Sequence, residues 1–581
     1  MFIMKTFFTA VFLIALGALI LLPPQLFAQA PDTMYVAALP PGNLNQVING
    51  DTTATGERNN INRVYVLQQT GPVDTTYFIT NQIQIPNLTL VGKVNPTTGH
   101  IPVIEPFINP DGGSPGNIAA CWAGSYVRFY NLFLLGTRTD GSQVTQQCVS
   151  PYGGDSCHYV MSHCVFENFG TSGTPNILNT WASANDVIKV DHCLFRDNQS
   201  SVPQNPGMNW SGPAVNGVDT MIVTNSSFFV LGGNITGSGS TIGYFKFDHN
   251  TIFMHTKSSP FSCRGMANAY ITNNIFYSCY SAGLDSNHVY NPQVYNANFY
   301  SLPAIFTLDS LVADSSEFTY YGFTEQNRVI DVQNNAYFWP QGVLDNFNTL
   351  NSDPQYKAVG GMIFAPQFMA VRPGAEAVLQ DPGITFTNND STDPGFDPTL
   401  VAMAVDSMNR FVQYVWANGG SGLSEKPFVY TTDPINPFNN VPTDWKSTQG
   451  YPVQENLRYT NAALLTADNG LPLGDLTWWP DKVTGVKKVS NSLPTQFTLS
   501  QNYPNPFNPT TNIKYSVTKS GMVTLKVYNL LGQEVATLVS QNQKPGNYMV
   551  DFNATNLASG VYMYRLQAGN FSLTKKMILL K

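Results

Sequence analysis

Residues 243–277 have the sequence GYFKFDHNTIFMHTKSSPFSCRGMANAYITNNIFY, which contains one short pattern twice, as FKFDHNTIF and AYITNNIFY. Phe247 and Ile271 hold the same position in the two copies. Equivalent apolar residues recur every 23 to 38 residues, at Phe129, Met161, Val190, Val223, Phe247, Ile271, Val294 and Val332. Periods of this length indicate stacked structural repeats.

Each copy predicts two short strands joined at a corner. Two places after the apolar residue stands Asn or His, and five places after it stands Leu, Ile, Phe or Tyr. Because strand side chains alternate between faces, inward positions five residues apart cannot share one unbroken strand. Asn suits the corner, since it tolerates left-handed backbone angles. We therefore expect an inward column of corner residues with a spacing of about 4.8 Å. Its members are Asn131, His163, His192, Asn225, His249, Asn273, Asn296 and Asn334.

This pattern resembles the right-handed parallel β-helix family, the pectate-lyase-like solenoids, in which an asparagine ladder occupies such a corner. The resemblance covers about half the chain and implies a fold, not an activity. We expect an all-β protein, a right-handed parallel β-helix solenoid with a C-terminal immunoglobulin-like β-sandwich. The expected divisions are a signal peptide (1–30), an N-terminal cap and first coil (31–92), the β-helix (93–382), a closing region with one helix (383–481), a linker (482–496) and the sandwich (497–581).

The N-terminus and the charge indicate an exported protein. Lys5 precedes an apolar run from Phe7 to Leu22 and the small residues Ala28 and Ala30, a pattern typical of a secretory signal peptide and too short for a membrane span. No later apolar run is long enough to cross a bilayer, so we expect no transmembrane segment after signal removal. The net charge of -8 argues against nucleic acid as a partner, because phosphate binding needs a basic stripe.

The seven cysteines all lie between Cys121 and Cys279. Cys164 and Cys193 fall in one column of adjacent coils, where a spacing of about 4.8 Å is within disulfide reach. Buried, stacked thiols are the alternative. The sequence contains no Cys/His spacing typical of a zinc site.

The C-terminal region carries a second resemblance. NYPNPFNPTT at 502–511, VYNLLGQEV at 527–535 and GVYMYRL at 560–566 closely resemble the type A C-terminal sorting domain of the type IX secretion system. The resemblance implies a Gram-negative bacterium, with type IX secretion machinery as a partner. It also implies that the protein is secreted or displayed on the exterior of the outer membrane.

One long helix is expected after Asp397, where an N-cap residue is followed by Pro398 and by apolar residues at helical spacing. The preceding segment places Asn389, Ser391, Asp393 and Asp397 at the spacing of a calcium loop. A proline stands where that loop needs its glycine, which favours capping of the helix by Asp397. Calcium is the only cofactor that the sequence suggests.

The corner histidines invite a catalytic interpretation, because Asp191 precedes His192 and Asp248 precedes His249. We expect a structural ladder instead. Asn fills the same position in other coils, and period-two alternation turns the column inward and the preceding Asp side chains outward.

Other site candidates follow from the resemblance, because pectate-lyase-like enzymes use the strand face before the ladder strand and its flanking loops. The substrate-binding candidates there are Asn179, Trp181, Trp210 and Asp285, of which the tryptophans offer flat faces for sugar stacking or pack within loops. Arg264 is the candidate base, since β-eliminating lyases of this family use an arginine side chain as the catalytic base. Elimination also needs a cation, usually calcium, and no Asp cluster on consecutive coils is present to hold it.

Asp191 and Asp248 complete the catalytic candidates. They share a column two coils apart, about 10 Å, with Thr224 between them. Inverting glycoside hydrolysis uses carboxyl groups about 6.5 to 9.5 Å apart, so the pair lies at the edge of that range. Two hypotheses remain: a non-catalytic protein that binds extracellular polysaccharide, and a polysaccharide lyase or glycoside hydrolase. The missing acidic cluster favours the first.

Overall fold

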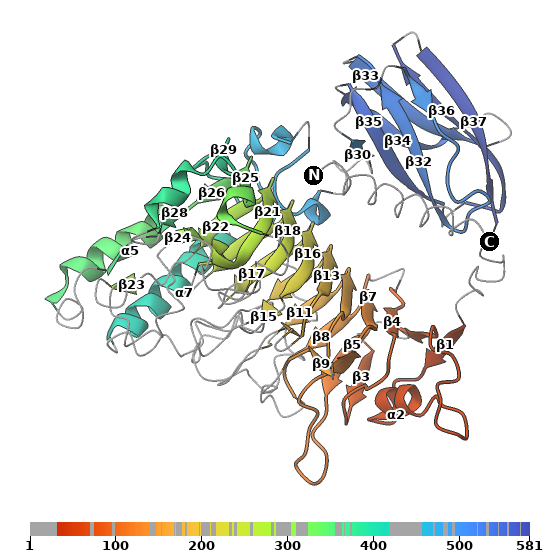
Figure 1. Cartoon of the computed structure of the whole chain (residues 1–581), viewed down its shortest axis with the longest axis horizontal. Coiled ribbons are helices and arrows are strands. Elements are labelled where there is room, and N and C mark those ends of the chain that lie inside the picture. Colours follow the sequence, from red (N-terminus) through yellow and green to blue (C-terminus); the bar gives the residue numbers. More distant parts are fainter. Residues whose placement is uncertain are drawn as a thin grey trace, which may run out of the picture.

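The computed structural model describes residues 32–580 with gaps, the longest of which are 139–146, 170–176, 199–208, 211–216, 286–303, 310–322, 355–362, 418–455 and 480–485. Parallel strands stack along one axis into a β-helix, and a separate antiparallel β-sandwich follows it (Figure 1). The expected all-β fold class is confirmed.

Three sides of the β-helix are built from parallel strands. Sheet A contains β1 (Thr33–Val36), β2 (Val64–Leu67), β4 (Leu88–Gly92), β7 (Tyr126–Tyr130), β10 (His158–Ser162), β13 (Asp186–Asp191), β16 (Val218–Thr224), β18 (Ile242–Asp248), β21 (Met266–Thr272), β25 (Val329–Gln333) and β29 (Ile384–Thr387). Sheet B contains β3 (Thr76–Ile79), β5 (Val103–Pro106), β8 (Phe133–Leu135), β11 (Val165–Glu167), β14 (Leu194–Arg196), β17 (Ser227–Leu231), β19 (Thr251–His255), β22 (Ile275–Cys279) and β26 (Ala336–Phe338).

The third side is shorter and divided. One part, sheet C, pairs β6 (Ala119–Trp122), β9 (Val149–Tyr152), β12 (Leu178–Asn179) and β15 (Asn209–Trp210). The other part pairs β20 (Phe261–Ser262), β24 (Ala304–Leu308) and β28 (Gln367–Val371). Buried apolar side chains from all three sides form one continuous core.

The register of sheet A follows the sequence repeat. Phe129 lies opposite Met161, and the column continues through Val190, Val223, Phe247 and Ile271. These residues are buried. Ile271 pairs directly with Val332, so the repeat expected at Val294 has no place between them in this sheet. Val294 and Asn296 lie outside the described residues.

The corner residues have the expected left-handed backbone, but their side chains point outward and not into the core. Positive φ angles of 48° to 60° occur at Asn131, His163, His192, Asn225, His249, Asn273 and Asn334. Apart from His249 these residues are exposed or half-buried, so the column does not line the core. The inward ladder stands one residue later, because a left-handed residue turns the next side chain inward. Its hydrogen-bonded members are Ser226, Asn250, Asn274, Asn335 and Asn389.

Helices and short elements cover the ends and one face of the β-helix. They are α2 (Asn43–Asn49), η2 (Cys263–Gly265), η3 (Glu325–Asn327), α5 (Gln341–Ser352), η4 (Glu376–Gln380), α7 (Pro398–Ala417), η6 (Leu464–Thr466), η7 (Leu476–Trp478) and the strand pair β23 (Leu284–Asp285) and β27 (Ile363–Phe364). α5 was not expected from the sequence. α7 begins as expected, with Asp397 Oδ1 accepting hydrogen bonds from the amides of Thr399 and Leu400.

An aromatic row on the outside of sheet B anchors the closing region. Phe229, Phe253 and Tyr277 stack across neighbouring strands, with ring centroids 5.2 and 5.0 Å apart. Phe396 packs edge-on against this row, and Val343 and Trp479 belong to the same buried cluster. Segments far apart in sequence therefore share a second core over this face.

The C-terminal sandwich consists of two four-stranded sheets. Sheet D contains β30 (Val486–Ser490), β31 (Thr498–Leu499), β32 (Thr510–Val517) and β35 (Gly546–Asn553), and sheet E contains β33 (Gly521–Tyr528), β34 (Glu534–Gln543), β36 (Gly560–Ala568) and β37 (Phe571–Leu579). β30 lies in the stretch expected to be a linker. It pairs with β35 and covers what would otherwise be an open edge of sheet D.

All seven cysteines are buried free thiols, which is the alternative to the Cys164–Cys193 disulfide. Among the residues that the structure describes, no helix has the length and apolar character needed to span a membrane.

Candidate functional site

An Asp–His pair occurs twice at the edge where sheet A meets the corner. Asp191 and Asp248 end β13 and β18, and each is followed by a corner histidine. Thr224 lies between the two carboxylates in register, with Asn225 in the next corner position. From β13 to β21 the coils therefore alternate between Asp–His and Thr–Asn.

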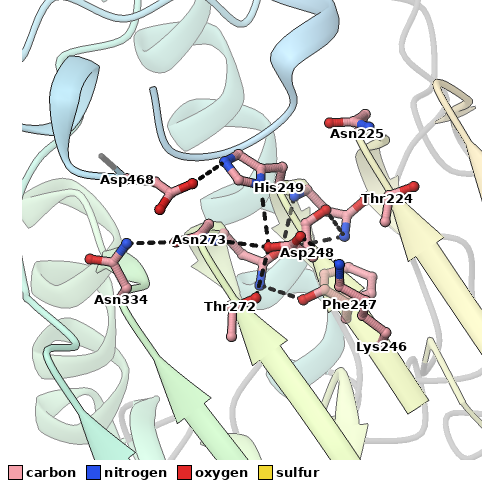
Figure 2. Close-up of polar contacts among 12 residues, drawn as sticks. Thr224, Asn225, Lys246, Phe247, Asp248, His249, Thr272, Asn273, Asn334 and Asp468 are labelled. Atoms are coloured by element: carbon pink, nitrogen blue, oxygen red, sulfur yellow. Dashed lines mark hydrogen bonds and ion pairs between the residues drawn. The ribbon is translucent and has the colours of Figure 1, made fainter. Parts of the chain in front are cut away.

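Asp248 is the more enclosed of the two carboxylates (Figure 2). Its Oδ1 accepts hydrogen bonds from Thr272 Oγ1 at 2.7 Å and from Asn273 Nδ2 at 2.9 Å, both on the following coil. Its Oδ2 lies 3.0 Å from Lys246 Nζ, and His249 Nδ1 lies 3.2 Å from Oδ1. Both oxygens are thus occupied by groups of the protein itself.

The closing region supplies a third partner. Figure 2 shows Asp468 approaching His249 from the side opposite Asp248, with Asp468 Oδ2 3.3 Å from His249 Nε2. Gly474 brings this segment close to the β-helix: its φ is 78°, and its amide donates to the carbonyl of Asn273 at 2.8 Å. A Cβ atom at Gly474 would lie 2.5 Å from Thr251 Oγ1, so a glycine is required there.

Asp191 accepts the corresponding hydrogen bonds from its next coil in a more open setting. Its Oδ1 accepts hydrogen bonds from Thr224 Oγ1 and Asn225 Nδ2, at 2.7 and 2.9 Å. Its Oδ2 lies 2.8 Å from His192 Nδ1. The side chain of Asp191 is 43% exposed, compared with 17% for Asp248.

These contacts determine the charges. Burial alone raises the pKa of Asp191, but hydrogen bonds from His192, Thr224 and Asn225 lower that pKa to about 2. Burial also opposes ionisation of Asp248, yet His249, Lys246 and Thr272 hold its pKa well below the usual range. Burial lowers the pKa of His249, whereas Asp248 and Asp468 raise it to about 9. At neutral pH the inner site therefore contains an ion pair between the Asp248 carboxylate and the His249 imidazolium, with Asp468 Oδ2 3.3 Å from His249 Nε2.

The outer site continues into a pair of stacked imidazoles. The rings of His163 and His192 lie 4.7 Å apart and nearly parallel, on neighbouring coils. Ser162 Oγ lies 2.9 Å from His163 Nδ1. Burial and the neighbouring His192 lower the pKa of His163, so this ring is neutral at neutral pH.

The structure brings two of the predicted binding residues together. Asn179 on β12 is in register with Trp210 on β15, on neighbouring strands of sheet C. Asp285 lies on β23, opposite Ile363. Trp181 lies outside the described residues.

The three catalytic candidates do not form one site. Arg264 lies in η2, directly before β21 begins at Met266. Met266 pairs with Ile242 at the start of β18, whereas Asp248 ends that strand. Asp248 is six residues after Ile242 along β18, which at about 3.3 Å per residue is about 20 Å. Because Arg264 lies just before Met266, the partner of Ile242, its backbone is at least about that far from Asp248. An arginine side chain does not span that distance.

Two parts of this region were missed by the sequence reasoning. Tyr244 and Lys246 alternate with the buried Phe245 and Phe247, so period two could have placed them on the outer face of sheet A. Asp468 has no comparable signal, because its contact with His249 joins positions more than 200 residues apart.

The calcium alternative is not supported by the contacts of its proposed ligands. Asn389 belongs to the inward ladder, and Asp397 caps α7. Among the described residues, no group of three or more His, Cys, Asp or Glu side chains is arranged to hold a metal ion.

Comparison with known proteins identifies the end of the chain. Residues 501–580 match the family described as the secretion system C-terminal sorting domain. The match confirms the expected type IX sorting domain, so the protein is a secreted or cell-surface protein exported by that system. A comparison of the whole chain with curated proteins found no match.

Proposed function

We propose that the β-helix binds extracellular polysaccharide at the outer surface of the cell and does not cleave it. The observation that carries this proposal is the outer face of sheet A. Tyr244 is 37% exposed, and its ring centroid lies 5.7 Å from that of Tyr270 on the next coil. Tyr126 and Arg128 lie on the same face, with the guanidinium 3.7 Å from the ring centre.

Such a face suits an extended glycan. Aromatic rings bind the apolar faces of sugars, while neighbouring hydroxyl and amide groups bind their hydroxyls. Thr220 and Asn268 lie in register on either side of Tyr244 and supply those polar groups. Lys189 is exposed two coils before Lys246 in the neighbouring outward column.

The state of the carboxylates favours binding over hydrolysis. Inverting hydrolysis needs one carboxylic acid that carries a proton at neutral pH. The pKa values of Asp191 and Asp248 are both lowered by their hydrogen-bond donors, so neither supplies that proton. A register separation of two strands, about 10 Å, also lies at the upper edge of the range that this mechanism uses.

The test is binding of the full-length protein to a panel of polyuronates and neutral glycans by calorimetry. Replacing Tyr244 and Tyr270 together by Ala should weaken binding at least about tenfold, which corresponds to about 1.4 kcal/mol. Tyr503→Ala is the matched control, because Tyr503 is an 81% exposed tyrosine of the sandwich. No binding to any glycan would reject the proposal.

The alternative, a polysaccharide lyase or glycoside hydrolase, is tested in the same samples. Unsaturated products and new reducing ends are followed over a prolonged incubation. Product formation that is lost in Arg264→Ala would establish a lyase and overturn the non-catalytic proposal. Product formation that is lost in Asp191→Asn or Asp248→Asn would establish a hydrolase.

A further inference from the structure

The charges of the chain are distributed unevenly. Residues 497–581 contain eight Lys and Arg residues but only two acidic residues, Glu534 and Asp551, a net charge of +6. The whole chain has 29 basic and 37 acidic residues, which leaves 21 and 35 for residues 1–496, a net charge of -14. A basic domain at the end of an acidic chain indicates an anionic partner for that domain.

Part of the excess charge is concentrated on one face of the sandwich. Lys526 on β33 lies directly opposite Arg565 on β36. Lys576 on β37 is opposite Met563, which is itself opposite Tyr528. We call the outward surface formed by Lys526, Arg565 and Lys576 the basic face. Glu534, opposite Tyr528, is the single acidic residue of the four strands of sheet E.

The basic face brings cationic side chains from neighbouring strands together and holds one of them in place. Lys526 and Arg565 are directly opposite each other on antiparallel strands, so both cationic side chains belong to the same part of the surface. Arg565 is also pre-organised. Its guanidinium donates to Tyr528 Oη at 2.8 Å and lies 4.9 Å from the ring centre. Holding the planar group in place reduces the entropy lost when it binds a carboxylate.

The polar composition of this face favours an acidic protein surface over a lipid surface. Thr524, Gln567 and Thr574 accompany the cations in register and supply hydrogen-bonding groups. The apolar residues on the same side of the sheet, Val561, Met563 and Ile578, are half-buried. Membrane binding needs exposed apolar side chains that insert. The exposed Leu573 lies opposite the buried Leu566, on the other side of the sheet, so it does not contribute to the basic face.

We propose that the basic face is the surface through which the sorting domain docks onto an acidic protein component of the secretion machinery. The proposal is independent of polysaccharide binding, which concerns the β-helix. It also separates two functions within the sorting domain: sheet D and the motif at residues 502–511 hold the fold, and sheet E contacts the partner.

The experiment is export of the full chain from its native cell. In the test variant, Arg565→Gln and Lys576→Gln remove two exposed charges of the basic face. In the matched control, Lys514→Gln and Lys519→Gln remove two exposed charges elsewhere in the sandwich, Lys514 lying on β32 of sheet D. We expect the test variant to accumulate in the periplasm with at least a fivefold loss at the surface, and the control to be exported within twofold of the parent.

Four outcomes would overturn the proposal. Normal export of the test variant would show that the face is dispensable, and equal loss in both variants would show that only total charge matters. A pair that keeps the charge, Arg565→Lys with Lys576→Arg, should restore export; failure to do so would show that packing, not charge, is responsible. Binding to phosphatidylglycerol vesicles that is lost in the test variant while export is unchanged would assign the face to lipid.

Discussion

Asp248 combines burial with a full negative charge. A buried carboxylate normally takes up a proton, because burial penalises the charged form. Here hydrogen bonds from Thr272 and Asn273 on the next coil, together with Lys246 and His249, reverse that preference. The carboxylate therefore connects two coils directly and the closing region through His249. Its removal should lower the free energy of unfolding of the β-helix.

Replacing Asp248 by Asn should lower the free energy of unfolding by about 3 kcal/mol, because it leaves the buried His249 cation with one partner fewer. Asp191→Asn is the matched control. Asp191 accepts the corresponding hydrogen bonds from Thr224 and Asn225 but is 43% exposed, so we expect about 1 kcal/mol or less. Denaturant unfolding of both variants measures the difference. Equal losses would mean that burial does not govern these pairs.

His249 should make the β-helix sensitive to alkaline pH. Its pKa is about 9 in the folded chain, above the usual 6.5 of an unfolded histidine. A raised pKa means that the stabilisation is fully present below about pH 6.5 and is lost as pH rises to about 9, by at most about 3 kcal/mol. Thermal unfolding between pH 6 and 10 should show this loss. His249→Asn, which keeps a residue suited to the corner, should lack it.

The inward ladder is the element that sets the register between coils. Asn274 Nδ2 donates to the carbonyl of Phe247 at 2.9 Å and to Asn335 Oδ1 at 2.9 Å. Its Oδ1 accepts from the backbone amide of Asn250 at 2.8 Å. The same set of bonds recurs from coil to coil, so each amide connects three successive turns of the chain.

Asn274→Ala should therefore destabilise the β-helix by about 3 kcal/mol, since it leaves a buried amide and a buried carbonyl without partners. Asn131→Gly serves as the control at the outer corner. Asn131 has a φ of 52°, which glycine adopts readily, and we expect a change below about 1 kcal/mol. The two unfolding midpoints are compared in denaturant. If Asn131→Gly lowered the free energy of unfolding more than Asn274→Ala, the corner residues and not the inward ladder would be the stabilising column.

The same elements show what the sequence can predict. The apolar column from Phe129 to Ile271 predicts the coils and the register of their strands, because every strand of sheet A repeats the same alternation. The ladder was placed one residue early. Asn273 and Asn274 are both asparagine, and simple alternation does not include the turn that a left-handed residue imposes on its successor.

The site was less predictable than the coils. The outward direction of Tyr244 and Lys246 can be predicted from period-two alternation, because successive side chains of a strand point to opposite faces. Asp468 and β30 do not, since each depends on a contact between distant parts of the chain and not on a local pattern. Pairs of that kind become visible only when the whole fold is in place.

At the scale of the molecule, the β-helix and the sandwich have separate cores. The residues of the β-helix core and those of the sandwich form distinct clusters, the latter extending from Leu499 to Leu579. Removing the sandwich should therefore leave the β-helix folded. The boundary for such a deletion must precede β30, because Val486–Ser490 pairs with β35 and would otherwise remain as an exposed strand.

A chain that ends at Asp481 should accumulate in the periplasm, because it lacks the sorting domain that matches at residues 501–580. Its β-helix should unfold at the same denaturant concentration as in the full chain, since the two cores share no residues. Cell fractionation and protease accessibility at the cell surface measure the first expectation, and denaturant unfolding the second. Surface display of this folded truncate would show that export does not require the domain. Loss of β-helix stability would instead show that the sandwich supports the fold, in which case an export defect alone would not establish sorting.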